Sequence, residues 1–128
     1  MTYLAFALLL GLSGAAPATD DGIAMAKRVT AAIKGQAEFQ DSDFVRPLEA
    51  SDKAALRGFA PCKVEEITHT LMADPTERDT YMSNPNEVLV RFGCKGVPSS
   101  TPVGITLELR NGRIETVETH NADLMKVR

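Results

Sequence analysis

The fold of this chain is decided by residues 104–114, whose sequence is GITLELRNGRI. An Asn-Gly pair between two strand-like runs favours a two-residue hairpin turn in which both residues take positive φ. The turn therefore predicts antiparallel strands over residues 103–110 and 113–120, with Leu109 opposite Ile114. The register of these two strands sets which side chains share a face.

The second strand of this hairpin carries polar residues whose direction depends on that register. If no bulge intervenes, three of them lie on the apolar face of the first strand, namely Thr116, Glu118 and His120 opposite Leu107, Ile105 and Val103. Titratable groups on an apolar surface are costly to bury unless they are paired or face a wet cavity, which makes this the best candidate site. The alternative is a bulge between Ile114 and Val117, which would turn Glu118 and His120 outward and place Val117 inside.

Helical patterns precede the strand patterns along the chain. Apolar residues at helical spacing predict a first helix over residues 21–34, and residues 51–57 form a short second helix. Strand-like runs follow at residues 62–72, 87–94, 103–110 and 113–120, and the polar segments 73–86 and 95–102 read as loops that can serve as rims or lids. This order predicts an α+β fold, with N-terminal helices packed on a curved antiparallel sheet of about four strands.

The beginning of the chain predicts export. Leu4–Leu12 is an uncharged apolar run that leads to Ala16-Pro17-Ala18, the pattern of a secretory leader with an A-x-A cleavage site. We expect residues 1–18 to be a signal peptide, residues 19–128 to form a single α+β roll domain, and the mature protein to be periplasmic or secreted. The run is too short for a stable membrane span, and the alternative is an uncleaved N-terminal anchor.

Composition narrows the classes of partner. The chain has 14 Lys and Arg against 17 Asp and Glu, a formal net charge of −3, and its basic residues are spread along the sequence. A nucleic-acid surface needs a clustered basic face, so we expect no nucleic-acid partner. An anionic membrane surface is disfavoured for the same reason.

The chain contains two cysteines, Cys62 and Cys94. An even number of cysteines in an exported protein predicts a disulfide, which would close a loop of roughly 30 residues and stabilise the fold by about 3 kcal/mol. A catalytic thiol would need an activating base beside it, and no histidine adjoins either cysteine.

This arrangement resembles the nuclear-transport-factor-like fold, the cone-shaped α+β roll shared by ketosteroid isomerases, polyketide cyclases and many uncharacterised exported bacterial proteins. The resemblance spans residues 22–123 and rests on the opening helix, the segment Ser51–Leu56, the strand Glu87–Phe92 and the terminal hairpin 104–114. It implies a curved sheet folded around helices, a pocket at the open end of the cone, and a homodimer formed through the outer sheet face.

The resemblance carries no activity to this chain. Enzymes of that superfamily combine a carboxylate base with a Tyr or a protonated acid, but Tyr3 lies in the leader and Tyr81 in a predicted loop, so no pocket Tyr can be matched. Asp43 lies about where the family places a pocket acid, and it also suits a turn before Phe44.

Four residues remain as candidate ligand-binding groups: His120, Glu118, His69 and Asp43. A histidine oriented by a carboxylate can act as a general acid or base, whereas a lone histidine beside Ile67 and Leu71 also fits a structural role. The only conceivable metal set is His69, His120 and Asp123, which reads more simply as solvated polar groups. We therefore expect neither a metal nor a cofactor.

The sequence favours an exported binding or interaction domain without clear catalytic residues, which holds a small apolar ligand in its cone or a protein partner on its sheet. One alternative is a small lyase or isomerase that transfers protons through a His/carboxylate pair, which requires those side chains to converge in a pocket. Another is a periplasmic inhibitor-like protein-binding module, which requires an exposed apolar patch and no cavity.

Overall fold

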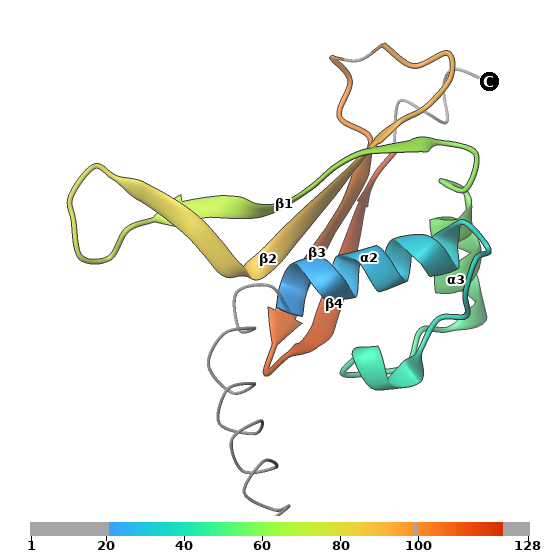
Figure 1. The fold of residues 1–128 in the computed structure, drawn as a ribbon, viewed down its shortest axis with the longest axis horizontal. Coiled ribbons are helices and arrows are strands. Elements are labelled where there is room, and N and C mark those ends of the chain that lie inside the picture. The colour runs from blue at the N-terminus through green and yellow to red at the C-terminus, as the bar shows by residue number, and fades with distance from the viewer. Residues whose placement is uncertain (1–20, 99, 122–128) are drawn as a thin grey trace, which may run out of the picture.

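In the computed structural model, which describes residues 21–98 and 100–121, two α-helices pack against a four-stranded antiparallel sheet (Figure 1). The elements in chain order are α2 (Asp21–Ile33), the 3-10 turn η1 (Asp41–Asp43), α3 (Ala50–Arg57), β1 (Lys63–Ala73), β2 (Tyr81–Gly93), β3 (Gly104–Arg110) and β4 (Arg113–His120). The predicted α+β class and sheet are confirmed. The predicted leader at residues 1–18 and Asp123 lie outside the described residues.

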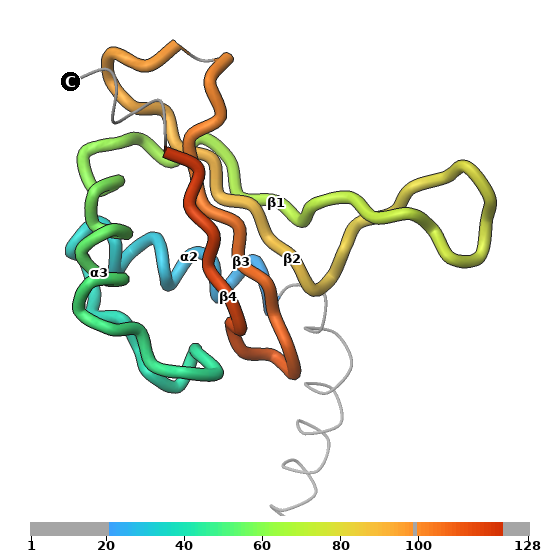
Figure 2. The backbone as a smooth tube through the Cα atoms, turned by 180° about the vertical axis from the view of Figure 1, so that it is seen from behind, coloured from blue at the N-terminus to red at the C-terminus, as the bar shows by residue number. Residues whose placement is uncertain are grey.

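The sheet is a simple meander in which each strand pairs with the next one along the chain, in the order β1-β2-β3-β4. It is curved but not closed, so β1 and β4 are both edge strands. Seen from behind, the sheet face away from α2 carries no helix (Figure 2). One face of the sheet therefore builds the core, and the other is open.

The core fills the sheet face that α2 covers. Apolar residues recur along α2 at helical spacing and bury Met25, Ala26, Val29 and Ile33 against the sheet. The sheet residues beneath the helix are fully buried, namely Val88, Val90, Ile105 and Leu107. Full burial of such a side chain stabilises the fold by roughly 1.5–3 kcal/mol. The part of this sheet face that lies beneath α2 is thus filled by protein side chains.

The predicted disulfide joins Cys62, just before β1, to Cys94, just after β2, with their Cα atoms 4.4 Å apart. Beside it, the ring of Phe59 stacks on Phe92 with ring centroids 4.8 Å apart. The ammonium group of Lys34 donates hydrogen bonds to two backbone carbonyl oxygens there, including that of Cys62 at 2.7 Å. These contacts tie the end of α2 to the start of the sheet.

The β3–β4 hairpin has the predicted turn but not the predicted register. Asn111 and Gly112 take φ values of 53° and 77°, and Leu109 pairs with Ile114 as expected. Glu115 forms a β-bulge, so every later residue of β4 pairs one position away from the register predicted without a bulge. The actual pairs are Glu108 with Thr116, Leu107 with Val117, Thr106 with Glu118 and Gly104 with His120. The unbulged register was wrong, and the alternative bulge between Ile114 and Val117 is confirmed.

The segment expected to be a loop at residues 73–86 is largely a β-hairpin. β2 begins at Tyr81, and the β1–β2 pairing passes from His69 with Val88 to Leu71 with Ser83. Residues 84–87 thus lie opposite the single residue Thr70. This irregularity contains the Asn-Pro-Asn sequence that is typical of a loop. Beyond it, residues 71–83, here named the arm, extend away from the helices (Figures 1 and 2).

Candidate functional site

Glu118 and His120 lie on the open face of the sheet. The Nε2 atom of His120 is 2.9 Å from the hydroxyl oxygen of Thr106 and 3.6 Å from Oε1 of Glu118. The side chains of His120 and Glu118 are 35% and 75% exposed. The bulge at Glu115 thus places this pair on the surface, where solvent weakens its electrostatic interaction.

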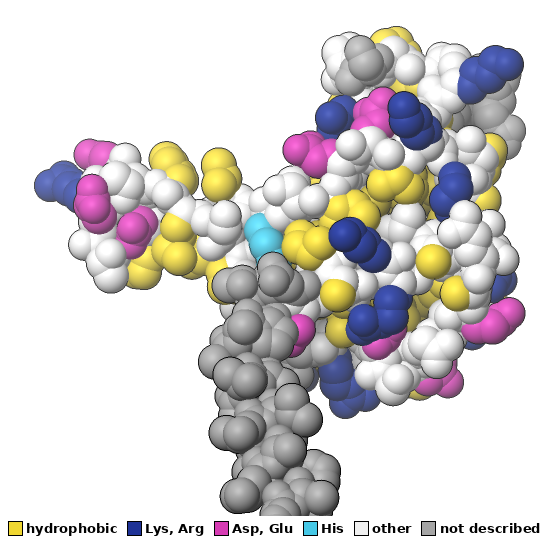
Figure 3. All heavy atoms as spheres, in the orientation of Figure 1, with side chains coloured by type: hydrophobic (Ala, Val, Ile, Leu, Met, Phe, Trp, Pro, Cys, Tyr) yellow, Lys and Arg dark blue, Asp and Glu magenta, His cyan; other side chains and the backbone are white. Residues whose placement is uncertain are grey.

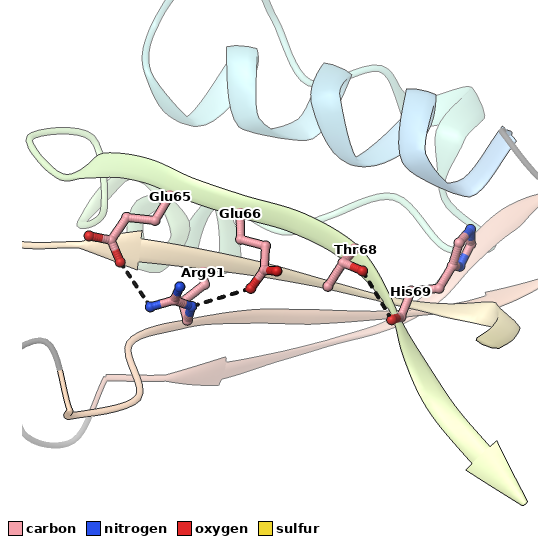
Figure 4. Close-up of polar contacts among 5 residues, drawn as sticks. All are labelled: Glu65, Glu66, Thr68, His69 and Arg91. Carbon is pink, nitrogen blue, oxygen red and sulfur yellow. Dashed lines mark hydrogen bonds and ion pairs between the residues drawn. The ribbon is translucent and has the colours of Figure 1, made fainter. Parts of the chain in front are cut away.

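His69 lies on the opposite, core-facing side of the sheet, at the first turn of α2. Its Nδ1 atom donates a hydrogen bond of 3.2 Å to the carbonyl oxygen of Glu87 on β2. A Cβ atom at Gly22 would lie 3.1 Å from Cε1 of His69, so the helix backbone packs directly on the imidazole. Figure 4 shows the ring pointing toward the start of α2. These contacts give His69 a structural role.

Asp43 forms a bidentate ion pair with Arg28. The Oδ2 and Oδ1 atoms of Asp43 accept hydrogen bonds of 3.2 and 3.0 Å from Nε and Nη2 of Arg28. The hydrogen bond to Asp43 is the main cause that raises the pKa of Arg28. The Asp43 side chain is only 13% exposed, so the pair fastens η1 to α2. This contact accounts for the carboxylate that the resemblance suggested as a pocket acid.

The four predicted site residues therefore do not converge. Asp43 lines a hollow of about 320 Å³ together with Arg28, Phe39 and Phe44. His69, Glu118 and His120 line none of the three principal hollows of the described residues. Within residues 21–98 and 100–121, no three His, Cys, Asp or Glu side chains come together as metal ligands would. The proton-transfer alternative thus finds no assembled pair inside a pocket in this part of the chain.

The open sheet face is mostly polar. Arg91 reaches across to β1, with Nη1 3.0 Å from Glu65 and Nε 3.5 Å from Glu66, where a bulge between Val64 and Glu66 brings both carboxylates near it (Figure 4). The other polar residues on this face are Thr68, Thr106, Glu108, Thr116, Glu118 and His120. Leu89, which pairs with Thr68 and Thr106, is an apolar residue on the same face. Homodimer interfaces are more apolar than the rest of a protein surface, and the homodimer that the resemblance implied through this face stays a prediction.

A groove of about 450 Å³ runs beside the free edge of β4. A parallel bridge between Phe44 and Ile114, with the N–H of Val45 donating to the carbonyl oxygen of Ile114 at 2.8 Å, joins the loop before α3 to the start of β4. The apolar residues that line the groove are Phe44, Pro47, Leu48, Ala55, Leu56, Ile114 and Val117. The sequence did not predict this groove, because the groove forms only when the bulge turns Val117 inward.

The largest exposed apolar side chains in the described residues lie on the arm. Leu71 is 71%, Tyr81 72% and Met82 40% exposed. Leu71 pairs with Ser83 and Ala73 with Tyr81 on one face of the ribbon, while Met72 pairs with Met82 on the other. Figure 3 shows hydrophobic side chains along the arm, clear of the molecular body. The sequence signal for this feature was the pair of apolar runs flanking residues 74–80.

Comparison of the chain with protein-family models, curated proteins and solved structures finds no match. Among the described helices, none has the length and hydrophobicity needed to cross a membrane. The nuclear-transport-factor-like resemblance therefore stays a prediction, and the function must be inferred from the residues themselves.

Proposed function

We propose that this chain is an exported protein-interaction domain that contacts its partner through the arm. The observation that carries the proposal is the exposure of Leu71, Tyr81 and Met82 on a ribbon that leaves the core. Clustered apolar exposure of this kind marks interaction sites in soluble proteins. In this proposal the arm binds a protein partner and the chain catalyses no reaction.

The physics of the arm supports a bound state. A two-stranded ribbon alone is at best marginally stable in water, and this one presents apolar side chains on both faces. Burying one Leu or Met side chain against a partner contributes roughly 1.5–3 kcal/mol. Binding would therefore stabilise the arm as well as hold the partner.

One further observation favours the arm over a ligand beneath α2, and another supports export. The sheet face beneath α2 is filled by fully buried side chains such as Val90 and Ile105, which leaves no room for an apolar ligand there. The disulfide between Cys62 and Cys94 suits an oxidising compartment, in agreement with the leader-like residues 1–18. Export is part of the proposal, and amino-terminal sequencing of protein recovered outside the cytoplasm tests it.

Site-specific photocrosslinking tests the interaction. The photoreactive residue p-benzoylphenylalanine replaces Tyr81 in the full chain expressed in its host cells, and a matched control carries it at Arg110, an exposed residue of the other hairpin. We expect a discrete crosslinked species from position 81 and none from position 110. Identical patterns from both positions, or none from either, would contradict the proposal.

The groove beside β4 supports a second candidate function, the binding of a small apolar ligand. Its volume of about 450 Å³ falls within the usual range for ligand pockets, roughly 300–1,000 Å³. Titration with 1-anilinonaphthalene-8-sulfonate tests this candidate. If the groove binds the dye, Leu48→Asp lowers the fluorescence and Leu71→Asp on the arm does not, whereas the opposite ranking assigns the dye to the arm.

A further inference from the structure

The sheet has two edge strands, and among the residues that the structure describes part of the β1 edge lacks protection. Residues 67–73 of β1 read ITHTLMA and contain no charged residue, glycine or proline. Exposed edges normally carry a charge, a proline, a bulge or a covering segment, because their unpaired backbone groups recruit other strands. No other described strand lies beyond β1.

The remaining edges have such protection. The loop at Phe44 and Val45 covers the start of β4, which also carries the bulge at Glu115 and the exposed Glu118. On the β2 side only residues 81–83 belong to the arm, and they are followed by Pro85, which has no N–H to donate. The first half of β1 contains its own bulge next to Glu66. Within residues 21–98 and 100–121, protection is missing where the arm leaves the core.

We propose that the partner of the arm is a second copy of this chain, which pairs antiparallel with residues 67–73 of β1 about a two-fold axis. This inference rests on the proposed function and names its partner. Two-fold pairing sets the residue on the axis against its own copy and reflects every other residue about that axis, so a charge on the axis would meet a like charge. Residues 67–73 contain no Asp, Glu, Lys or Arg, so a copy can pair with them in any such register without like charges meeting inside the segment. A second copy also supplies a matching open edge, and its pairing covers the edges of both chains at once.

Charge also selects the register. With the axis at Thr70, Asp74 would lie opposite Glu66 of the partner subunit, which places two like charges together. With the axis at Leu71, Asp74 lies opposite Thr68 of the partner subunit, and the two Leu71 side chains meet at the axis. Leu71 is 71% exposed in the single chain, so this register packs two exposed leucine side chains against each other.

The shape of the molecule permits this pairing. β1 bends at His69, and the arm beyond it points away from α2 and α3 (Figures 1 and 4). A second arm can therefore lie along the β1 edge without meeting the helices. The product is a four-stranded ribbon at the centre of the dimer, and three or more strands are what a small sheet needs for stability.

Sedimentation equilibrium of the purified, disulfide-bonded protein over a wide concentration range tests this dimer. We expect wild type to dimerise, and Leu71→Lys or Leu71→Glu alone to raise the dimer dissociation constant by on the order of tenfold or more, because each opposes like charges and loses apolar burial. An equimolar mixture of L71K and L71E should dimerise again. Asn86→Lys, which adds the same charge at an exposed β2 residue outside the arm, should leave the dissociation constant within about threefold.

The outcomes separate this inference from the proposed function. A wild-type chain that stays monomeric, L71K that dimerises like wild type, or a mixture that stays monomeric each overturns self-pairing at Leu71. A crosslink from position 81 to a different protein, with a monomeric purified chain, overturns the second copy but preserves the proposed function. Thermal melting of each variant confirms folding, which we expect because Leu71 and Asn86 are exposed.

Discussion

Val117 pairs with Leu107 across the β3–β4 ladder, because the bulge at Glu115 shifts every later residue of β4 by one position. Val117 consequently packs against the core, while its neighbours Glu118 and His120 lie on the open sheet face. A single unpaired residue thus moves the polar pair from a candidate pocket to the surface.

Truncation of β4 side chains tests this register. Val117→Ala should lower the free energy of unfolding by about 1–2 kcal/mol, because it removes partly buried methyl groups from the core. Glu118→Ala should change it by less than about 0.5 kcal/mol, since that side chain is exposed. Urea denaturation measures both, and a larger loss for Glu118→Ala would mean that the strand has the unbulged register.

The disulfide should contribute strongly to stability. Replacing both Cys62 and Cys94 with Ser frees a loop of sequence separation 32, which should cost about 3–4 kcal/mol of unfolding free energy in the chain-entropy model. Denaturation midpoints with and without a reducing agent measure the effect. Reductant should destabilise wild type and leave the double variant unchanged; equal sensitivity in both proteins would argue against the bridge.

Gly104 is required where β3 approaches β2. A Cβ atom at this position would collide with the carbonyl oxygen of Val90, a backbone atom that cannot move aside without disturbing the sheet. Gly104→Ala should therefore destabilise the fold by about 2 kcal/mol or more. Gly112→Ala is the control, because its Cβ meets no atom and only its positive φ makes it costly, at about 1 kcal/mol. Thermal melting that ranks Gly112→Ala as the worse variant would contradict this assignment.

The ion pair between Arg28 and Asp43 should contribute to stability and not to binding. A double-mutant cycle with Arg28→Ala and Asp43→Ala should give a coupling energy of about 0.5–1.5 kcal/mol, reduced at high salt because Arg28 is half exposed. Urea denaturation at two salt concentrations measures this coupling. Additive single effects would show that the two side chains do not interact, and Asp43 would again be free for another role.

The tip of the arm should show a pH response set by Asp74. The hydroxyl and backbone N–H of Thr76 donate hydrogen bonds of 2.7 and 2.8 Å to its carboxylate, which lowers the pKa of Asp74 below its usual value of 3.8. Since the folded-state pKa is the lower one, this contact stabilises the tip above about pH 4 and is lost as the pH falls through the folded-state pKa. Thr76→Val should raise the pKa toward 3.8 in an NMR titration of the side-chain carboxyl carbon; an unchanged value would contradict the contact.

Local patterns predicted most of the fold. The helix predicted at residues 21–34 is α2, and the Asn111-Gly112 turn forms with both residues at positive φ. These features depend on short-range spacing and turn chemistry, which the sequence displays directly. The loop predicted at residues 73–86 was wrong because Asn84-Pro85-Asn86 signals a turn locally, whereas the β1–β2 pairing resumes beyond it.

The candidate site was much less predictable. His69, Asp43 and the pair Glu118 and His120 were plausible by residue type, yet they occupy separate parts of the molecule. Leu71 was expected to share a face with His69, and whether such a residue is core or surface depends on how far α2 extends over the sheet. The sequence of β1 does not indicate the residue at which α2 stops covering the strand.

The sequence by itself determined the turn at Asn111-Gly112, the pairing of its only two cysteines and the segregation of helices from strands, because each follows from local or countable properties of the chain. The tertiary structure decided which way the side chains of β4 point and that the arm stands free of the core. Side chains in a strand alternate with a period of two, so one bulged residue reverses a whole face. Whether the bulge forms depends on distant groups, since the inward position of Val117 is fixed by the core and the start of β4 by its bridge to Phe44.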